Sequence, residues 1–244
     1  VSLEPCNHYG KTPPCTDLIL KHDIPKVVIA CRDPFKEVNG KGIERLRDAG
    51  VEVITGVLEK EAIDLNKRFF TFHTRHRPYI ILKWAATADG WMGKKGGERM
   101  LISNEYSNRL VHQWRGEEAA ILVGMQTALA DNPALTNRLW PGNSPVRVVI
   151  DRQLQLPAQL QLFDGTVKTI VFNTVKQEEN DKLVYYRLDN EKNLLPQILT
   201  ALYKMNIQSL LVEGGAQTLQ SFIDLGSWDE IRVIQSAAPA PAFR

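Results

Sequence analysis

Short β-branched runs alternate with helical segments along most of the chain, and this order constrains the fold more than any other feature of the sequence. Residues 25–30 (PKVVIA) and 51–56 (VEVITG) flank residues 40–50, whose apolar positions recur at helical spacing and which end in Gly. A strand-helix-strand order favours parallel strands, because the connecting helix packs back on the sheet. The sequence therefore predicts an α/β protein with a largely parallel sheet.

A polar stretch at 73–78 separates two such patterns, and we place the domain boundary there, giving domains 1–76 and 77–244. One amphipathic helix over 59–72 is expected to close the first domain. In the second, Ser103 is the expected cap of a helix whose capping box is incomplete, because Tyr106 stands where Glu is usual. The expected strands of the second domain are 79–87, 119–123, 146–150, 168–172, 183–186 and 209–212, and its expected helices are 104–114, 194–205 and 216–225.

Composition excludes several classes of protein. Of the 244 residues, 43% are hydrophobic and 24% are charged, which is typical of a globular protein rather than a disordered one. No apolar run approaches the roughly 18 residues of a membrane span, so we expect no membrane partner. The net charge of +2 argues against nucleic acid as the main partner. Three cysteines favour a reducing, cytoplasmic location over a disulfide framework.

Cys6 and Cys15 stand in a proline-rich stretch, EPCNHYGKTPPC, where thiolates would suit zinc. The alternative is that they are two free thiols of a loop. A catalytic zinc needs three protein ligands and an open position. Nucleotide-type deaminases supply a His or Cys plus two Cys, with a nearby glutamate that moves protons, but none of the five histidines begins a His-x-Glu triplet. We therefore expect the chain to begin inside a domain.

The residues around these cysteines are a more specific signal than the two cysteines alone. Glu4-Pro5-Cys6, His8, Gly10 and Thr12-Pro13-Pro14-Cys15 together resemble the zinc-binding signature of the riboflavin-biosynthesis deaminases, within the cytidine-deaminase-like superfamily. The resemblance implies that Cys6 and Cys15 bind zinc, with the third ligand and the catalytic glutamate upstream. His8 and Lys11 would then contact substrate, although a solvated loop explains them equally well.

Five clusters in the second domain have the residue types of a nucleotide-dependent reaction. They are KWAATADGWMG, which contains Lys83, then Arg115, VGMQTALADNPALTNR, VIDR and LLVEGGAQTLQS. A Gly-Gly turn between strand and helix can present backbone amides to an anion, although such a turn alone is more often a packing feature. Arg152 follows a strand end, where it could bind the extra phosphate of NADP or lie solvated at the surface.

In this order the clusters resemble the reductase domain of the riboflavin-biosynthesis family, whose fold is similar to dihydrofolate reductase. The two domains together resemble the bifunctional deaminase-reductases of that pathway, which implies zinc and NADPH as cofactors, pyrimidine ribosyl phosphates as substrates and a homo-oligomer. We expect the second domain to lack its end. Lys83 and Glu213 are the implied catalytic residues. The implied NADPH contacts are Ala85, Leu101, Thr127, Asp131, Arg152, Gly215, Ala216, Gln217, Thr218, Leu219, Gln220 and Ser221. The implied substrate contacts are Arg99, Arg115, Leu135, Arg138 and Glu213.

Some positions depart from the family, which often has Trp at Leu101 and Ser at Arg99 and Arg152, so these contacts differ here. Two alternatives stay open. One is a reductase whose deaminase domain is structural or inactive. The other is a deaminase-like nucleic-acid-binding module, which the near-neutral charge disfavours.

Overall fold

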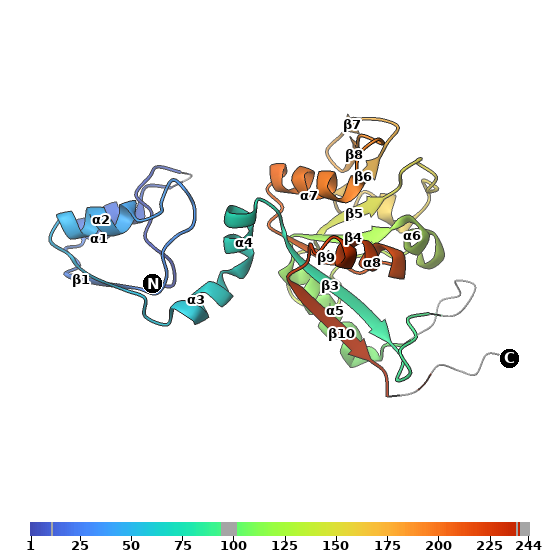
Figure 1. Ribbon diagram of the computed structural model, residues 1–244, viewed down its shortest axis with the longest axis horizontal. Coiled ribbons are helices and arrows are strands. Elements are labelled where there is room, and N and C mark those ends of the chain that lie inside the picture. The colour runs from blue at the N-terminus through green and yellow to red at the C-terminus, as the bar shows by residue number, and fades with distance from the viewer. Residues whose placement is uncertain (11, 94–101, 238, 240–244) are drawn as a thin grey trace. The chain divides into compact units, whose positions relative to one another are not determined.

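The computed structural model describes residues 1–10, 12–93, 102–237 and 239. The chain divides into two compact units, Val1–Arg77 and Pro78–Arg244, which we call the N-terminal and C-terminal units (Figure 1). Each unit is described by itself.

The N-terminal unit contains the expected strand-helix-strand arrangement. Its strands β1 (Lys26–Ile29) and β2 (Glu52–Thr55) pair in parallel, with Lys26 opposite Glu52. Helix α2 (Lys41–Asp48) connects them, and its buried Ile43 and Leu46 pack on Val27 and Ile29. The apolar spacing of α2 thus provides the small core of this unit.

Two features of this unit differ from the sequence-based prediction. The single helix expected over 59–72 is wrong: α3 (Glu59–Leu65) ends and α4 (Lys67–Arg75) begins at Asn66. The Asn66 side-chain amide donates to the backbone carbonyl of Ala62 at 2.8 Å. At the break between the helices, a polar side chain thus bonds to a carbonyl of the last turn of α3. Helix α1 (Cys15–Lys21) was not expected, and no side-chain cap marks its start at Pro14.

Over its described residues, the C-terminal unit is built on an eight-stranded sheet in the order β10-β3-β9-β4-β5-β6-β8-β7. All neighbouring strands are parallel except β7 and β8, which confirms the expected parallel-dominated α/β architecture. The strands are β3 (Tyr79–Ala86), β4 (Ala120–Gly124), β5 (Val146–Ile150), β6 (Thr169–Asn173), β7 (Glu178–Glu179), β8 (Leu183–Arg187), β9 (Ser209–Val212) and β10 (Glu230–Gln235). The helices are α5 (Glu105–Glu117), α6 (Met125–Asp131), α7 (Leu194–Lys204) and α8 (Ala216–Asp224), with a short 3-10 helix η1 (Gln161–Phe163).

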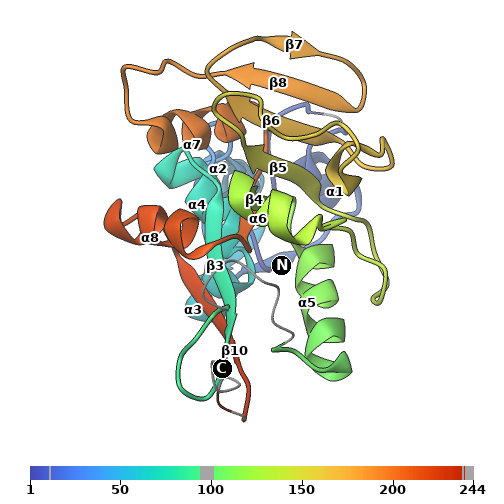
Figure 2. The ribbon, with the colours of Figure 1, turned by 90° about the vertical axis from the view of Figure 1, so that its right-hand side faces the viewer.

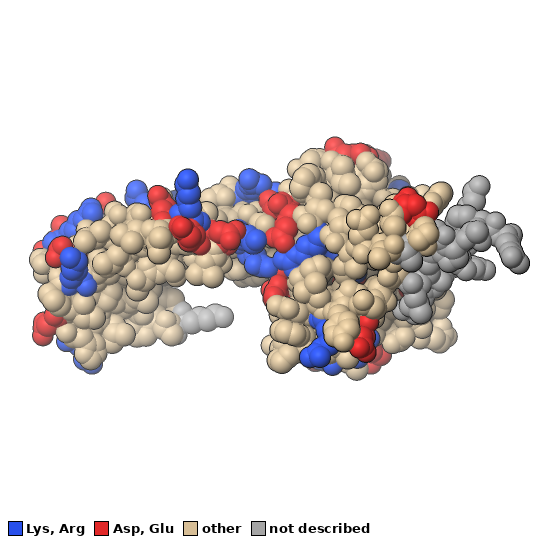
Figure 3. All heavy atoms as spheres, turned by 90° about the horizontal axis from the view of Figure 1, so that it is seen from below, with Lys and Arg blue, Asp and Glu red and all other residues tan. Residues whose placement is uncertain are grey.

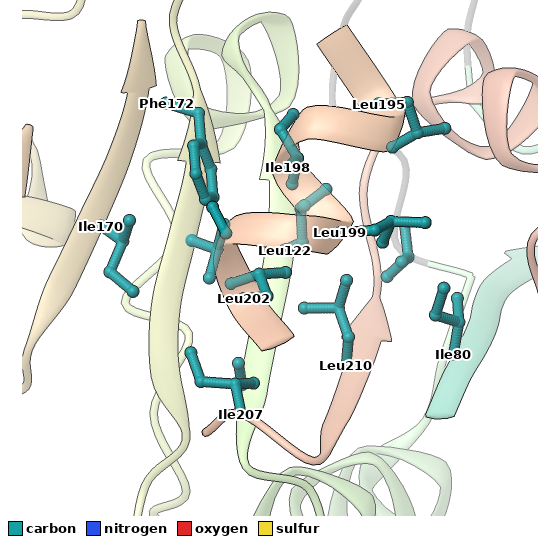
Figure 4. Close-up of a cluster of buried hydrophobic side chains, with 14 of the residues drawn as sticks. Ile80, Leu122, Ile170, Phe172, Leu195, Ile198, Leu199, Leu202, Ile207 and Leu210 are labelled. Atoms are coloured by element: carbon teal, nitrogen blue, oxygen red, sulfur yellow. The ribbon is translucent and has the colours of Figure 1, made fainter. Parts of the chain in front are cut away.

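Helices cover both faces of this sheet (Figure 2). On one face α7 and α8 bury Ile198, Leu202 and Phe222 against Leu122 and other strand residues, as Figure 4 shows for α7. The opposite face packs against α5, α6 and η1. Alternate residues of each strand therefore enter different cores, which explains why the central strands are apolar throughout.

The cap of α5 also differs from the sequence-based prediction. Asn104, not Ser103, is the N-cap, and its side chain accepts a hydrogen bond from Ser107 N. The Ser107 hydroxyl lies 3.0 Å from Asn104 N, so the capping box is complete. The prediction of an incomplete capping box is therefore wrong, because a serine at this position reaches the amide that a glutamate usually reaches.

The connections after β4 and β9 leave the sheet in opposite directions, although the two strands are neighbours. Strand β4 leads into α6 on one face, and β9 leads into α8 on the other. Neighbouring parallel strands with this divergence create a crevice at their carboxyl ends, where ligands bind in open α/β sheets. The topology therefore places the candidate site at the carboxyl ends of β4 and β9.

The surface has mixed charge: acidic and basic side chains are interspersed over the described residues in the view of Figure 3. Over the residues that the structure describes, no helix has the length and apolar character needed to cross a membrane.

Candidate functional site

A buried ionic cluster joins three elements of the C-terminal unit. Strand pairing sets Leu82 opposite Val212, so Lys83 on β3 lies level with Glu213 directly after β9. The Arg115 guanidinium of α5 makes two hydrogen bonds to the Glu213 carboxylate, from Nε to Oε1 at 2.9 Å and from Nη2 to Oε2 at 2.8 Å. Lys83 Nζ lies 3.8 Å from Oε2. The sequence-based prediction named all three residues, and the fold brings them together.

The two cations control the protonation of Glu213. Burial by itself would raise the pKa of this carboxyl, but Arg115 and then Lys83 outweigh burial and hold the pKa at about 2. Glu213 is therefore a carboxylate at neutral pH. A carboxylate has no proton to give, so within this cluster Glu213 can only accept, and Lys83 and Arg115 carry the donor groups.

The loop after α6 approaches this cluster and is fixed by a histidine that sequence reasoning missed. His112 of α5 is buried, and its Nδ1 accepts a hydrogen bond from Arg138 N at 2.9 Å. Burial, then Arg115 and Arg138, lower the pKa of His112 to about 4, so the ring is neutral and Nδ1 can accept. The contact spans 26 residues, and no local sequence signal marks it. In the same loop Leu135 is buried with a φ of 50°.

A cavity of about 910 Å³, which we call the β4–β9 cavity, opens at the carboxyl ends of β4 and β9. Its volume is in the range of small-molecule and cofactor sites. The residues that line it come from the ends of β4, β5 and β9 and from the starts of α6, α7 and α8. They are Gly124, Met125, Gln126, Thr127, Ile150, Arg152, Asn190, Lys192, Asn193, Leu194, Leu195, Ile198, Gly215, Ala216, Gln217, Thr218 and Ser221.

Glycines allow the backbone to pack closely beneath this cavity. A Cβ on Gly214 would lie 2.6 Å from Val123 Cα and 2.9 Å from Gly124 N, so a side chain would push the β9–α8 turn away from β4. Gly215 has a φ of 45°, and a Cβ there would lie 2.9 Å from Thr127 Oγ1. The Gly-Gly turn is therefore a close-packing feature, and the first residues of α8 that follow it line the cavity.

The expected cofactor contacts divide into three groups. Thr127, Arg152, Gly215, Ala216, Gln217, Thr218 and Ser221 line the cavity. Ala85, Asp131, Leu219 and Gln220 do not line it: Leu219 is buried in the core, and Gln220 donates to Asp224. Leu101 lies outside the described residues, as do the expected substrate contacts Lys11 and Arg99. Sequence reasoning missed Asn190 and Lys192, because only the fold brings the β8–α7 loop beside Arg152.

In the N-terminal unit the two expected metal ligands lie together, since Cys15 N donates to Cys6 Sγ at 3.3 Å. The Cys6 side chain, and then burial, raise the pKa of the Cys15 thiol. Arg45 ties the two loops, donating to Asn7 beside Cys6 and to Asp17 beyond Cys15. No cluster of three or more His, Cys, Asp or Glu able to hold a metal occurs among the described residues. They supply two thiols but not the three ligands of a catalytic zinc, so we assign no step to zinc here.

Residues 78–238 match the family described as the RibD C-terminal domain. The chain belongs to the RibD family. The cavity and the ionic cluster both lie inside the matched range, and the mixed α/β fold similar to dihydrofolate reductase is confirmed for this unit.

Several proteins named riboflavin biosynthesis protein RibD are similar over nearly the whole chain. The one from Aquifex aeolicus (strain VF5) is 41% identical over 244 residues, covering 96% of this chain and 67% of that protein. The one from Bacillus amyloliquefaciens is 40% identical over 240 residues, covering 95% of this chain and 65% of that protein. The chain thus spans about two thirds of the length of these RibD relatives.

Solved structures are also similar. A diaminohydroxyphosphoribosylaminopyrimidine deaminase/5-amino-6-(5-phosphoribosylamino)uracil reductase from Thermotoga maritima is 41% identical, with a TM-score of 0.81, over 91% of this chain and 63% of that one. RibD from Acinetobacter baumannii is 31% identical, with a TM-score of 0.87, over 99% of this chain and 72% of that one.

Proposed function

We propose that the C-terminal unit is an NADPH-dependent reductase of riboflavin biosynthesis that acts on 5-amino-6-(5-phosphoribosylamino)uracil. The observation that carries the proposal is that one RibD C-terminal domain contains both a cofactor-sized cavity at the carboxyl ends of its strands and a buried Lys83–Glu213–Arg115 cluster beside the end of β9. The name of the Thermotoga relative supports the substrate.

NADPH, when bound, supplies the hydride. The fit of the cavity supports this cofactor, because the glycine turn and the first residues of α8, where helix amides can bind an anion, line a mostly apolar cavity. The residues that would hold it are Thr127, Arg152, Gly215, Ala216, Gln217, Thr218 and Ser221. Ala85, Asp131, Leu101, Leu219 and Gln220 remain predictions from the family resemblance alone.

The reaction opens the ribose ring and reduces the anomeric carbon. The C1′–O4′ bond breaks as O4′ takes a proton, and the C1′=N bond that forms then gains hydride at carbon and a proton at nitrogen. One N–H proton is released, so the net uptake is one hydride and one proton. Lys83 donates the proton to O4′, and Glu213 holds Lys83 and Arg115 in place.

Arg115 and Arg138, the two arginines proposed to bind the substrate phosphate, differ in how many donors they can offer it. Arg115 is largely committed, because Nε and Nη2 bind Glu213 and Nη1 donates to Thr136 O at 3.3 Å. Arg138 is exposed, and its Nη1 is bonded to Thr136 Oγ1. Among the described residues Arg138 therefore has more donors free for a phosphate than Arg115 has. The buried Leu135 and the neutral His112 fix the loop that carries Arg138. Arg99 remains a predicted substrate contact.

For the N-terminal unit we propose the C-terminal part of a zinc-dependent deaminase domain that acts on diaminohydroxyphosphoribosylaminopyrimidine. The adjacent Cys6 and Cys15 support it, and His8 and Lys11 remain predicted substrate contacts. The alternative is a reductase with a structural or inactive deaminase domain. Zinc content and ammonia release by the full-length protein separate the two, since the alternative predicts no ammonia.

We also propose a cytoplasmic homo-oligomer. The free thiols of Cys6, Cys15 and Cys31 support a reducing compartment. The edge strand β10 exposes Ile231 and Val233, and an apolar edge strand is a ready pairing surface. Sedimentation equilibrium tests the oligomer, which a monomer at micromolar concentration would exclude.

The experiment that tests the reductase proposal is NADPH oxidation by the protein in the presence of the deaminated pyrimidine substrate. Oxidation that depends on the substrate and is lost in Lys83→Met supports the proposal. A folded protein that binds substrate but oxidises no NADPH contradicts it.

A further inference from the structure

The charged residues that line the β4–β9 cavity are few and share one sign. Among the described residues of the lining only Arg152 and Lys192 are charged, and both are cations. Arg152 follows β5, and Lys192 lies in the loop between β8 and α7. The rest of the lining is apolar or neutral, so these two side chains supply its net charge.

The loop that carries Arg152 is fixed at both backbone and side chain. The carbonyl oxygen of Arg152 accepts hydrogen bonds from Thr174 N and Thr174 Oγ1, each at 2.9 Å. Its guanidinium Nη2 donates to Asn190 Oδ1 at 2.8 Å, and among the described residues its other N–H groups have no partner. Asn190 also lines the cavity, so it holds the guanidinium on the cavity side.

The loop that carries Lys192 is also braced. Gln197 Oε1 accepts from Asp189 N at 2.9 Å, and Gln197 Nε2 donates to Asp189 O at 2.9 Å. Lys192 Nζ lies 2.8 Å from Asp189 Oδ2, while 73% of the lysine side chain remains exposed. Asp189 itself does not line the cavity. The lysine is thus held near the cavity rim but remains accessible to a ligand.

The two kinds of anion donor in the cavity suit different phosphates. The α8 start, at Gly215 to Thr218, offers neutral amides suited to a pyrophosphate, whereas the opposite loops offer full positive charges. A 2′-phosphate is a terminal group with about two negative charges, which a bidentate guanidinium and an ammonium match. NADH has no group of this kind.

We propose that Arg152 and Lys192 together bind the 2′-phosphate of NADPH and so select it over NADH, with Asn190 as the residue that positions Arg152. This proposal rests on the proposed function, because it assigns part of the same cofactor site. Lys192 and Asn190 act only through the adenosine end of the cofactor and take no part in the hydride step.

The test compares dissociation constants for NADPH and NADH, and for adenosine 2′,5′-bisphosphate and adenosine 5′-monophosphate, by calorimetry on the whole chain. Lys192→Gln and Arg152→Gln are each expected to weaken NADPH and the bisphosphate by about tenfold, because each removes one charge-assisted contact. NADH and the monophosphate should change less than about twofold. Asn190→Ala should weaken only the 2′-phosphorylated ligands, by about threefold.

Lys168→Gln is the matched control, since Lys168 also forms an exposed ion pair, with Glu179 at 3.2 Å, but lies outside the cavity lining. This control should bind all four ligands as the parent does. Equal weakening of NADPH and NADH by Lys192→Gln would place the lysine on the pyrophosphate and overturn the proposal, as would no change in any ligand. Failure of the parent to bind either dinucleotide would instead overturn the proposed function.

Discussion

Arg115 and Glu213 form a two-point ion pair that links α5 to the end of β9 inside the C-terminal unit, with N–O distances of 2.9 and 2.8 Å. The same carboxylate lies 3.8 Å from Lys83 Nζ. One buried anion therefore fixes two cations, one from a helix and one from a strand. Under the reductase proposal, stability and turnover should therefore depend on the same residue.

Replacing Glu213 with Gln should lower both stability and turnover. The change leaves two mostly buried cations without their counterion, which costs about 3 kcal/mol in the free energy of unfolding. NADPH affinity should change little, because Glu213 does not line the cavity. Urea unfolding, cofactor titration and steady-state rates measure the three quantities. Glu178→Gln is the control, since its exposed pair with Lys176 should contribute little. Unchanged turnover in Glu213→Gln would remove this residue from the mechanism.

The same pair gives a defined response to acid. The pKa of Glu213 in the folded protein is about 2, below its ordinary value of 4.5. A lowered carboxyl pKa stabilises the fold fully above pH 4.5, and this stabilisation is lost as the pH falls from 4.5 toward 2. Over that interval, the free energy of unfolding should fall more steeply with acid for the parent than for Glu213→Gln. Parallel curves would show that the pair does not control the titration.

The lowered pKa of His112 predicts a separate loss of stability, at a higher pH than the loss that Glu213 causes. Its pKa of about 4 lies below the ordinary 6.5, so the unfolded chain takes up the proton first and stability should fall between pH 6.5 and 4. His112→Asn retains an acceptor for Arg138 N but does not titrate, so this loss of stability should be absent. The exposed His22→Asn serves as the control. An equal loss in His112→Asn would contradict the prediction.

Gly214→Ala should damage the cofactor site without touching its lining. The added Cβ would meet backbone atoms of Val123 and Gly124 within 3 Å, and backbone cannot move as a flexible side chain can. We expect a loss of about 2 kcal/mol in stability from overpacking and weaker NADPH binding. Gly93→Ala, with no atom within 4 Å of the new Cβ, should leave both unchanged. Normal NADPH affinity in Gly214→Ala would show that the β9–α8 turn tolerates displacement.

In the N-terminal unit, Glu4→Gln should loosen the segment that follows β1. The buried Glu4 carboxylate accepts backbone hydrogen bonds from Gly40 and Gly42 at 2.9 and 3.0 Å, and longer ones from Asp33 and Ile43. An amide offers a single acceptor oxygen, so about 2 kcal/mol should be lost. Hydrogen exchange of residues 33–43 should accelerate while the C-terminal unit is unaffected. Unchanged exchange would mean that Glu4 does not hold this segment.

The sequence predicted the repeating parts of the fold well, because burial imposes a period that can be read locally. Residues 146–150 were expected as a strand, and β5 has those bounds. Helix ends were harder: Asn66 interrupts an apolar pattern that continues on both sides, and the capping box of α5 is completed by the Ser107 hydroxyl, which accepts from Asn104 N in place of a carboxylate.

Residues of the candidate site were predictable where a local pattern or the family resemblance marked them, as for Lys83, Arg115 and Glu213. His112 and Asn190 were missed, because their contacts join segments far apart in the sequence, and Lys192 was missed because only the fold places it in the cavity lining. In the sequence, a loop lysine near an aspartate looks like any solvent-exposed ion pair. Only the fold shows that this lysine lies at a cavity.

The most direct test of the reductase proposal follows the hydride itself. The protein is supplied with the phosphoribosylamino-uracil substrate and NADPH that carries deuterium at both C4 positions of the nicotinamide, and the product is examined by mass spectrometry. We predict a ribityl product with one deuterium on C1′, lost together with turnover in Lys83→Met. NADPH oxidation that leaves no deuterium in the product, or no oxidation by the folded protein, would contradict hydride transfer to the sugar in this unit.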